Sequence, residues 1–426
     1  MPTLSEDLAF RGLIHQVTDP ALLPKLDAGG LTVYTGFDPT ADSLHVGSML
    51  QLCTLRRFQL AGHRPISLAG GGTGMIGDPG GKTDERAMLT PEVLRGYLAG
   101  IRPQLSQFLD LSADSPHAAL LLDNSVWLGQ LTTIEFLRDV GKHFTVNQMM
   151  AKESVKTRLE RPDQGISYTE FSYMLLQAYD YLHLHTEYGC DLQIGGSDQW
   201  GNITMGVDYI RRVCQDEVWG LTTPLVVKDD GTKYGKTETG TIWLDPTRTS
   251  PFQMYQFFLN STDAMVGHYL RYFTFLSHQE IEALDTETAG HPERRAAQRA
   301  LARAVVGLVH GEGEVSKCEE ASAALFSEEI ATLTEDMLLA VTEDAPTTQI
   351  DRGEVIAGLS LVDVFERTGL AKSRGDARKL VKGGGTYVNN VRQADEQRKL
   401  EPKDLLHDRY IVLRKGPRDV HLLRIA

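Results

Sequence analysis

One stretch, Tyr34–Ser48, constrains the fold of this chain more than any other. Its sequence is YTGFDPTADSLHVGS; it follows a short apolar run and precedes an amphipathic segment, Met49–Gln59. Gly36 and Pro39 break extended structure, so the pattern predicts a strand, a tight loop and then a helix. This order of elements is typical of α/β sheets, in which such loops lie at the carboxyl ends of the strands.

The predicted loop and helix start also concentrate polar side chains. Asp42 or Ser43 is expected to cap the helix that begins at His45. Strand ends in α/β sheets bind ligands, and the positive end of a helix dipole attracts phosphate. The stretch therefore indicates a ligand site rather than an ordinary connection. Its polar residues are Tyr34, Asp38, Thr40, His45 and Ser48.

Short β-type runs alternate with helical segments along the first part of the chain. The runs cover residues 31–36, 65–70 and 118–123, and Thr90–Leu109 is one of the helical segments between them. Such alternation is typical of a parallel sheet with crossover helices. We expect an α/β fold built on a parallel sheet with crossover helices.

The glycine-rich loop GGTGMIGDPGGKTDER matches neither of two standard phosphate-binding motifs. A G-x-G-x-x-G pattern begins at Gly72, but Pro79 prevents the helix that a dinucleotide fingerprint needs, which argues against a dehydrogenase. The letters GKT at 81–83 resemble the end of a P-loop, whose first glycine would fall at Ile76. What remains is either a solvated turn or a loop that closes over phosphates. Its polar candidates are Asp78, Lys82 and Arg86.

The segment Phe171–Leu184 predicts a helix with a buried polar stripe. Tyr173, Gln177 and Asp180 fall at i, i+4 and i+7, on one face, and apolar neighbours leave little of the helix for solvent. A buried carboxylate requires a partner. A ligand hydroxyl or ammonium group would supply one, so we interpret this stripe as a pocket wall.

Two further loops follow predicted strands. In CDLQIGGSDQWGN, Gly195 and Gly196 allow a ligand to approach the backbone, and Asp198 is placed either to bind ribose hydroxyls or to cap a turn. After Leu221–Val227 comes KDDGTKYGKTETG, a polar loop whose cations would reach phosphates. The candidates on this loop are Lys233, Lys236 and Thr237.

Charge and composition divide the chain. The residues from Lys372 onward carry 14 Lys/Arg against 7 Asp/Glu, although the whole chain has a net charge of −14. A basic helix there, before a small sheet and a C-terminal hairpin, favours an RNA-binding module over a stabilising tail domain with a charged helix face. Its RNA-binding candidates, spaced at i, i+4 and i+8 on this helix, are Arg374, Arg378 and Lys382. The expected domains are 1–249 with a helical insertion at about 124–162, a helical region at 250–330, a linker at 331–350 and a small α+β domain at 351–426.

Cysteine spacing and hydropathy restrict the kinds of site and the cellular location that this chain can have. The four cysteines are widely spaced without a Cys-x-x-Cys pair, which argues against zinc and against a disulfide framework. No apolar run approaches the roughly 20 residues that span a bilayer. The first residues do not form a secretory signal. We expect a cytoplasmic protein with no membrane partner and no metal site.

Taken together, the motifs resemble one family. HVGS at 45–48 is similar to the HIGH signature of class I aminoacyl-tRNA synthetases. With GGTGMIGDP, EFSYMLLQAYD, LQIGGSDQWGN and KYGKT it occurs in the order found in bacterial tyrosyl-tRNA synthetases. The resemblance covers nearly the whole chain, including a C-terminal module similar to that of ribosomal small-subunit protein four.

The resemblance implies an activity and a set of partners. Such an enzyme activates L-tyrosine with ATP, releases pyrophosphate and transfers the tyrosyl group to the 3′-terminal adenosine of tRNA(Tyr). ATP enters as a substrate with Mg²⁺, and neither zinc nor an organic cofactor is expected. The family acts as a homodimer, for which the segment Ile134–Phe144 is a candidate contact. It also implies catalysis on a Rossmann-like nucleotide-binding parallel sheet in 1–249, anticodon binding in an α-helical domain at 250–330 and RNA binding in 351–426.

The family's residue roles map onto positions of this chain. Tyr34 and Asp180 match the groups that bind the tyrosine phenol. The ammonium and carboxylate are assigned to Asp78, Tyr173, Gln177 and Gln199. The adenylate is assigned to Gly36, Asp38, Gly47, Ser48, Gly196, Asp198 and Lys236. The phosphate-side groups are Thr40, His45, Lys82, Arg86, Lys233, Lys236 and Thr237.

Two positions depart from the family pattern, and two alternatives remain. Ser48 stands where the signature has histidine, and Thr35 stands where cysteine is usual, which puts two ribose contacts in doubt. A tryptophanyl-tRNA synthetase shares the architecture, although an indole offers only a hydrogen-bond donor to the paired Tyr34 and Asp180. An inactive, synthetase-derived RNA-binding protein would be expected to lose the phosphate-side groups.

Overall fold

The computed structural model describes residues 2–78, 89–159, 165–227, 241–324, 327–343, 345–416 and 419–426. The chain forms two compact units. The first contains Met1–Thr249 and Leu259–Val309, and the second contains Ser250–Phe258 and His310–Ala426. Within the described ranges, no helix has the length and apolar content needed to cross a membrane.

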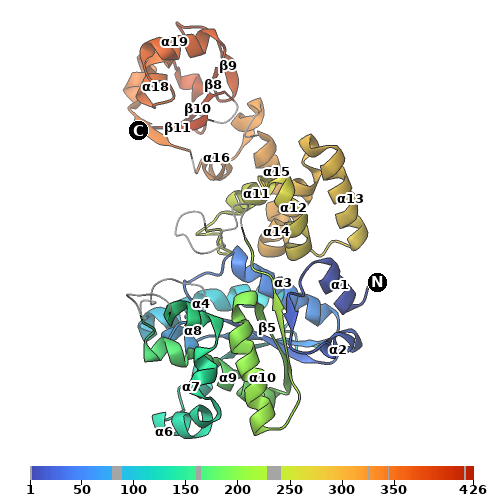
Figure 1. The fold of residues 1–426 in the computed structure, drawn as a ribbon. Coiled ribbons are helices and arrows are strands. Elements are labelled where there is room, and N and C mark those ends of the chain that lie inside the picture. Colours follow the sequence, from blue (N-terminus) through green and yellow to red (C-terminus); the bar gives the residue numbers. More distant parts are fainter. Residues whose placement is uncertain are drawn as a thin grey trace. The chain divides into compact units, whose positions relative to one another are not determined.

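A six-stranded sheet forms the centre of the first unit, in the order β1-β6-β5-β2-β3-β4 (Figure 1). The strands from β6 to β4 run parallel, and β1 pairs antiparallel with β6. The predicted fold class, a Rossmann-like parallel sheet, is thereby confirmed. The strands are β1 (Gln16–Val17), β2 (Thr32–Phe37), β3 (Arg64–Ala69), β4 (Leu120–Asp123), β5 (Cys190–Gly196) and β6 (Trp219–Thr223).

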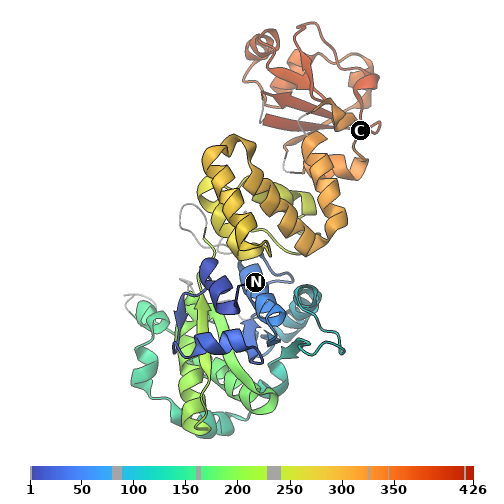
Figure 2. The same cartoon turned by 90° about the vertical axis from the view of Figure 1, so that its right-hand side faces the viewer.

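Helices cover both faces of this sheet. Helix α3 (Val46–Leu60) packs on β2 and β3, and α4 (Pro91–Phe108) packs on β3 and β4. Helices α9 (Tyr168–Tyr188) and α10 (Trp200–Val213) pack on β5. Because crossovers are right-handed, the two pairs lie on opposite faces (Figure 2). The strand order reverses between β2 and β5, which makes this the topological switch point where α/β sheets bind ligands.

Local sequence explains where the long helices begin and end. Thr90 caps α4 ahead of Pro91, a residue that suits the first helical turn because it needs no backbone donor. Ser167 caps α9, and Gly189 ends it in the left-handed conformation with φ +64°. The short helices of the first unit are α1 (Leu4–Phe10), α2 (Leu22–Ala28), α5 (Ser125–Leu128), α6 (Thr133–Glu135), α7 (Val146–Met150) and α8 (Glu153–Leu159).

Two buried arginines join the sheet layer to the end of α12 (Asp263–Phe273). This helix is followed in the chain by α13 (His278–Gly290) and α14 (Ala296–His310). Arg57 of α3 and Arg11 after α1 both donate to the carbonyl of Thr274, at 2.6 and 3.1 Å. The last carbonyls of a helix have no partner within it, and cations are favoured there. Burial lowers the pKa of Arg57 to about 10, and Asp7 lies 2.8 Å from Arg11.

The second unit contains a five-stranded sheet in the order β7-β11-β10-β8-β9. Its C-terminal hairpin was predicted and is confirmed by the antiparallel pairing of β10 and β11. The strands are β7 (Thr347–Ile350), β8 (Thr386–Val388), β9 (Val391–Gln393), β10 (Tyr410–Lys415) and β11 (Asp419–Ile425). The helices are α11 (Pro251–Leu259), α15 (Glu312–Ala324), α16 (Glu335–Val341), α17 (Arg352–Ile356), α18 (Leu361–Arg367) and α19 (Arg374–Lys382).

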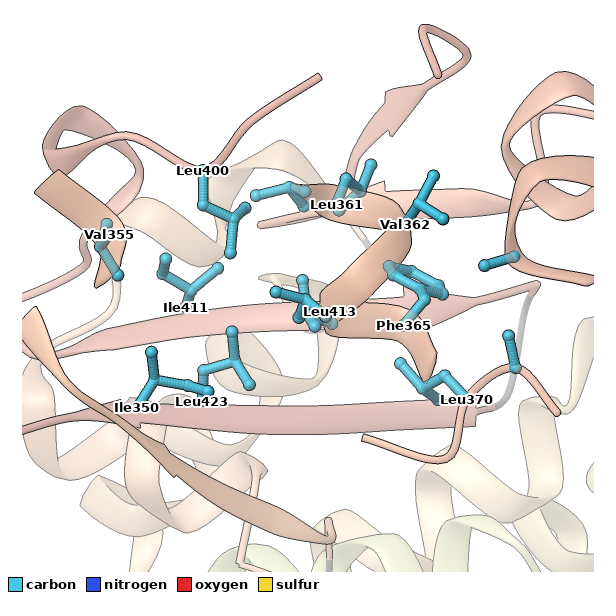
Figure 3. Packing of buried hydrophobic residues seen from close by; sticks show 14 of the residues in the cluster. Ile350, Val355, Leu361, Val362, Phe365, Leu370, Leu400, Ile411, Leu413 and Leu423 are labelled. Carbon is cyan, nitrogen blue, oxygen red and sulfur yellow. The ribbon is translucent and has the colours of Figure 1, made fainter. Parts of the chain in front are cut away.

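Alternate residues of β10 serve two different cores. Ile411 and Leu413 face α18, where they pack with Phe365 (Figure 3). Tyr410 and Val412 point to the opposite face, as the two-residue period of a strand requires, and pack with residues of α16 and its neighbours.

This second core explains the structure of residues 331–350, which the sequence had suggested as a linker. The segment contains α16 and β7. Leu333 and Leu338 are buried against the sheet, and β7 pairs in parallel with β11. The acidic and threonine-rich composition hid these apolar contacts, because their partners lie some 70 residues away in sequence.

Candidate active site

A cavity of about 350 Å³ lies at the switch point of the first unit. Its walls come from the carboxyl ends of β2 and β5, the start of α3, and α9. Fourteen residues that the sequence had suggested line this one cavity: Tyr34, Gly36, Asp38, Thr40, His45, Gly47, Ser48, Asp78, Tyr173, Gln177, Asp180, Gly196, Asp198 and Gln199. Thr35 lines it as well.

Other predicted residues are placed elsewhere or are not described. Five of the predicted phosphate-side residues lie outside the described ranges: Lys82, Arg86, Lys233, Lys236 and Thr237. The predicted RNA-binding residues Arg374, Arg378 and Lys382 are exposed on or at the ends of α19, in the second unit. Arg374 pairs with Asp363, and Lys382 pairs with Glu396.

The helix cap at the start of α3 differs from the prediction. Neither Asp42 nor Ser43 caps the helix; His45 does, because its Nδ1 accepts a hydrogen bond from the backbone N–H of Gly47 at 3.0 Å. The Ser43 hydroxyl instead donates to the carbonyl of Leu44. An Nδ1 that accepts cannot carry the proton, so the neutral ring of His45 holds its proton on Nε2. The ring thus has a defined donor end.

One end of the cavity contains a tyrosine beside a carboxylate. Tyr34 is fully buried, and its hydroxyl makes no hydrogen bond with the described residues. Asp180 is also buried; its two oxygens accept from Trp127 Nε1 at 2.7 Å and Asn124 Nδ2 at 2.8 Å. Burial raises the pKa of Asp180 to about 7, against the effect of these two donors. Burial and the nearby Asp180 charge raise the pKa of Tyr34, so its hydroxyl keeps its proton.

A hydrogen-bond chain connects Asp180 to a second carboxylate. Asn124 Nδ2 also lies 2.9 Å from the Thr73 hydroxyl, which donates to Asp38 at 2.7 Å. Tyr173 donates to the other oxygen of Asp38 at 2.8 Å. The backbone at Gly70 makes room for this chain, since a Cβ there would lie 2.0 Å from an Asp38 oxygen.

Amides and a third carboxylate form the opposite wall. Gln199 Nε2 donates to Asp78 at 2.5 Å, and its Oε1 accepts from Gln177 at 3.2 Å. Asn202 donates to the side-chain oxygens of both glutamines. This network fixes the amide orientations, so that acceptor oxygens and the Asp78 carboxylate sit where a cation would bind.

Sequence reasoning missed several residues of the site. Asn124, Thr73 and Gln193 line the cavity, and Trp127 supports it through Asp180. Asn124 directly follows β4, so the rule used for β2 and β5, that ligand residues follow strand ends, would have found it. No sequence pattern indicated Trp127, because it lies in α5 and donates to Asp180 of α9, a helix distant in sequence.

The arrangement favours recognition and charge stabilisation over covalent chemistry. The described lining residues include the carboxylates of Asp38, Asp78, Asp180 and Asp198, and no lysine or cysteine. Asp78 and Asp180 are buried, and carboxylates gathered in one cavity attract a ligand ammonium. At the other end His45 and Thr40, beside the amino end of α3, suit an anion. Among the described residues, no group of three or more His, Cys, Asp or Glu side chains is arranged to hold a metal ion.

Comparisons with known proteins agree over the whole chain. The family model described as "tRNA synthetases class I (W and Y)" matches residues 27–327, and the model "Tyrosine--tRNA ligase SYY-like C-terminal domain" matches residues 338–423. Curated proteins named "Tyrosine--tRNA ligase" include one from Roseiflexus castenholzii, 53% identical, and one from Opitutus terrae, 50% identical. In both comparisons the match covers 100% of this chain and 100% of the relative.

Solved structures show the same fold. A C-terminally truncated mitochondrial tyrosyl-tRNA synthetase from Aspergillus nidulans has a TM-score of 0.69 and 33% identity, covering 76% of this chain and 95% of that one. A tryptophanyl-tRNA synthetase from Encephalitozoon cuniculi, bound to tryptophan, has a TM-score of 0.53 and 14% identity, covering 79% and 92%. The second likeness concerns the fold alone.

Proposed function

This chain belongs to the tyrosine–tRNA ligase family of class I aminoacyl-tRNA synthetases, and from that membership we infer that it couples L-tyrosine to tRNA(Tyr) with ATP. The reaction has two steps: tyrosine and ATP form tyrosyl-adenylate and pyrophosphate, and the tyrosyl group then passes to the 3′-terminal adenosine of the tRNA. We expect the protein to act in the cytoplasm, where translation takes place.

The observation that carries this proposal is the pair formed by Tyr34 and Asp180. The Tyr34 hydroxyl stays protonated and can donate, and the Asp180 carboxylate can accept, so together they match a phenol, which does both. Phenylalanine would leave both groups unpaired in a buried site, which is costly. Tyrosyl-tRNA synthetases are themselves the reference case for this effect, with discrimination of about 10⁵-fold against phenylalanine and no editing.

The rest of the cavity accommodates the amino acid backbone and the nucleotide. We assign the tyrosine ammonium to Asp78, Tyr173 and Gln177, and its carboxylate to the vicinity of Gln199. Asp198 is assigned to the ribose hydroxyls. The remaining adenylate contacts are Gly36, Asp38, Gly47, Ser48, Gly196 and Lys236. Ser48 is shorter than the histidine of the signature, so its ribose contact is weaker or water-mediated.

Activation needs positioning and charge stabilisation rather than a base. The tyrosine carboxylate is already an anion and attacks the α-phosphate of ATP in line, with pyrophosphate leaving on the opposite side. Charge grows on the departing phosphates, and preorganised donors there lower the barrier. We assign this role to Thr40 and to the Nε2–H of His45. Mg²⁺ enters bound to ATP, as part of the substrate.

We also assign the phosphate side to five residues outside the described ranges, because their order in the sequence matches the family motifs: Lys82, Arg86, Lys233, Lys236 and Thr237. Loss of one such charged contact is expected to cost about 2–4 kcal/mol in the transition state, with little change in tyrosine affinity.

Amino-acid-dependent exchange of pyrophosphate into ATP tests the proposal. Each of the twenty amino acids is supplied in turn with MgATP, and tyrosine alone should support exchange. Exchange with tryptophan in place of tyrosine would establish the rival tryptophan-specific enzyme. No exchange with any amino acid from a folded protein would establish an inactive, RNA-binding relative.

The domains receive roles from the same family membership. We propose that residues 1–249 carry catalysis, with an insertion at about 124–162, and that 250–330 contact the anticodon arm. Residues 351–426 are proposed to bind tRNA through α19, whose exposed Arg378 lies in the basic C-terminal part of an otherwise acidic chain.

We further propose that the enzyme acts as a homodimer. Large apolar side chains are exposed close together in sequence in the insertion: Val126, Ile134, Leu137, Val146 and Met150. Clustered exposed apolar residues mark interaction sites, and a second copy of the chain is the partner that the family supplies. The earlier candidate contact, Ile134–Phe144, lies within this group.

A further inference from the structure

A short segment after the KYGKT loop is paired with the start of α3. The backbone N–H of Val46 donates to the carbonyl of Ile242 at 3.0 Å, and that of Leu244 donates to Leu44 at 2.8 Å. His45 and Trp243 therefore face each other as partners in an isolated antiparallel bridge. Two stretches almost 200 residues apart in sequence are thus held in one register.

The opposite side of the same stretch is held by α4. Gln104 Oε1 accepts from the backbone N–H of Leu44 at 2.8 Å. Gly100 allows α4 to come this close, because a Cβ there would lie 2.0 Å from the Asp42 carbonyl oxygen. The backbone before His45 is consequently fixed from two sides, which leaves the orientation of the imidazole ring to its own contacts.

Those ring contacts include Trp243. The two ring centroids are 6.0 Å apart with an interplanar angle of 70°, an edge-to-face arrangement. The indole is itself held in place, since the Arg248 guanidinium lies 3.6 Å from its ring centroid and pairs with Asp42 at 2.7 Å. Thr249, which is buried, accepts from the Trp243 backbone N–H at 3.0 Å.

From this geometry we propose that Trp243 is a positioning residue that fixes the imidazole of His45 for adenylate formation. The terminal torsion of histidine is broad and roughly two-fold, so a hydrogen bond at Nδ1 does not by itself fix the tilt of the ring. Edge-to-face packing against Trp243 removes this freedom and holds the Nε2–H toward the leaving phosphates. The inference rests on the phosphate-side role proposed above for His45.

The first experiment compares Trp243→Leu with Trp243→Phe in pyrophosphate exchange. A misplaced transition-state group costs rate rather than binding, so the leucine variant should lose between about tenfold and about a hundredfold in kcat. Its tyrosine Kd should stay within about twofold. The phenylalanine variant, which keeps an aromatic edge, should recover most of the rate. A rise in KM at unchanged kcat would overturn the proposal.

A double-mutant cycle with His45→Ala separates positioning from general damage. If Trp243 acts through His45, Trp243→Leu should have almost no further effect on kcat once the imidazole is gone. The same fold loss in both backgrounds would overturn the proposal. Trp219→Leu, which removes another indole of this unit, serves as a control and should lower kcat equally with or without His45.

The cycle also distinguishes a failure of the inference about Trp243 from a failure of the role proposed for His45. If His45→Ala alone leaves kcat unchanged, the role proposed for His45 is wrong and the positioning inference falls with it. If His45→Ala is slow but the cycle shows no coupling, only the inference about Trp243 is wrong. Should Trp243→Leu fail to fold, Trp243→Met carries the same cycle with the same outcomes.

Discussion

Replacing Tyr34 by phenylalanine should stabilise the free protein while weakening tyrosine binding. The Tyr34 hydroxyl is buried without a hydrogen-bond partner among the described residues. A neighbouring tyrosine provides a matched control: the Tyr181 ring lies 5.2 Å away, and its hydroxyl donates to the carbonyls of Asp191 and Trp219 at 2.9 and 2.7 Å. The two changes remove the same atom from adjoining positions.

The magnitudes follow from what each hydroxyl contacts. A buried polar group without a partner costs about 1–3 kcal/mol, so Tyr34→Phe should raise the free energy of unfolding by about 1 kcal/mol or more. Tyr181→Phe should lower it by about 0.5–1.5 kcal/mol, since the one hydroxyl proton that these two carbonyls share is lost. In the complex, Tyr34 contributes one neutral hydrogen bond to the phenol. Its loss should weaken tyrosine affinity by about 0.5–1.5 kcal/mol, or about 2- to 13-fold.

Urea unfolding and calorimetric titration with tyrosine measure the two effects. The expected result is opposite signs for Tyr34→Phe, with stability raised and affinity lowered, and a loss of stability alone for Tyr181→Phe. Discrimination against phenylalanine in pyrophosphate exchange should fall in Tyr34→Phe. A less stable Tyr34→Phe protein, or one with unchanged tyrosine affinity, would refute the assignment of this hydroxyl to the substrate phenol.

Three further predictions concern charge and association. Because the folded pKa of Asp180, about 7, exceeds its ordinary 3.8, this group lowers the free energy of unfolding by up to about 1.4 kcal/mol per pH unit as the pH rises from about 4 to 7. Asp180→Asn should flatten this pH dependence of the free energy of unfolding, measured with urea at several pH values. The tyrosine affinity of the unaltered protein should decrease as the pH drops below about 7. The same pH dependence in the variant and the unaltered protein would contradict the burial argument. Arg378→Glu should raise the KM for tRNA about tenfold and reduce the logarithmic salt dependence of that KM by about 1, while pyrophosphate exchange stays unchanged. Arg352 already pairs with Asp408, so Arg352→Glu should change neither the KM for tRNA nor its salt dependence. Ile134→Glu should shift sedimentation from dimer toward monomer, whereas Val93→Glu, which changes an exposed side chain of α4, should not. A dimer in both variants would rule out the insertion as the contact.

Much of the site was predictable because its ligands come from local patterns. The polar stripe Tyr173–Asp180 is visible from helical periodicity, and Tyr34 and Asp198 from their positions at the ends of apolar runs. Such patterns depend on a few neighbouring residues, and the structure gathers these side chains in one cavity. The confirmed hairpin at the C-terminus was predictable for the same reason.

What the sequence alone determined is the parallel sheet, its ligand-binding edge and the family to which the motifs belong. The tertiary structure decided how the groups are held: Asn124 and Trp127 orient Asp180, His45 caps its own helix, and Trp243 bridges to it. It also decided that residues 331–350 fold onto the C-terminal sheet. The contacts of Asn124, Trp127 and Trp243, like the packing of residues 331–350, join partners that lie far apart in the chain, and only the folded chain brings them within contact. The His45 cap is local, but the spacing did not distinguish it from a cap by Asp42 or Ser43.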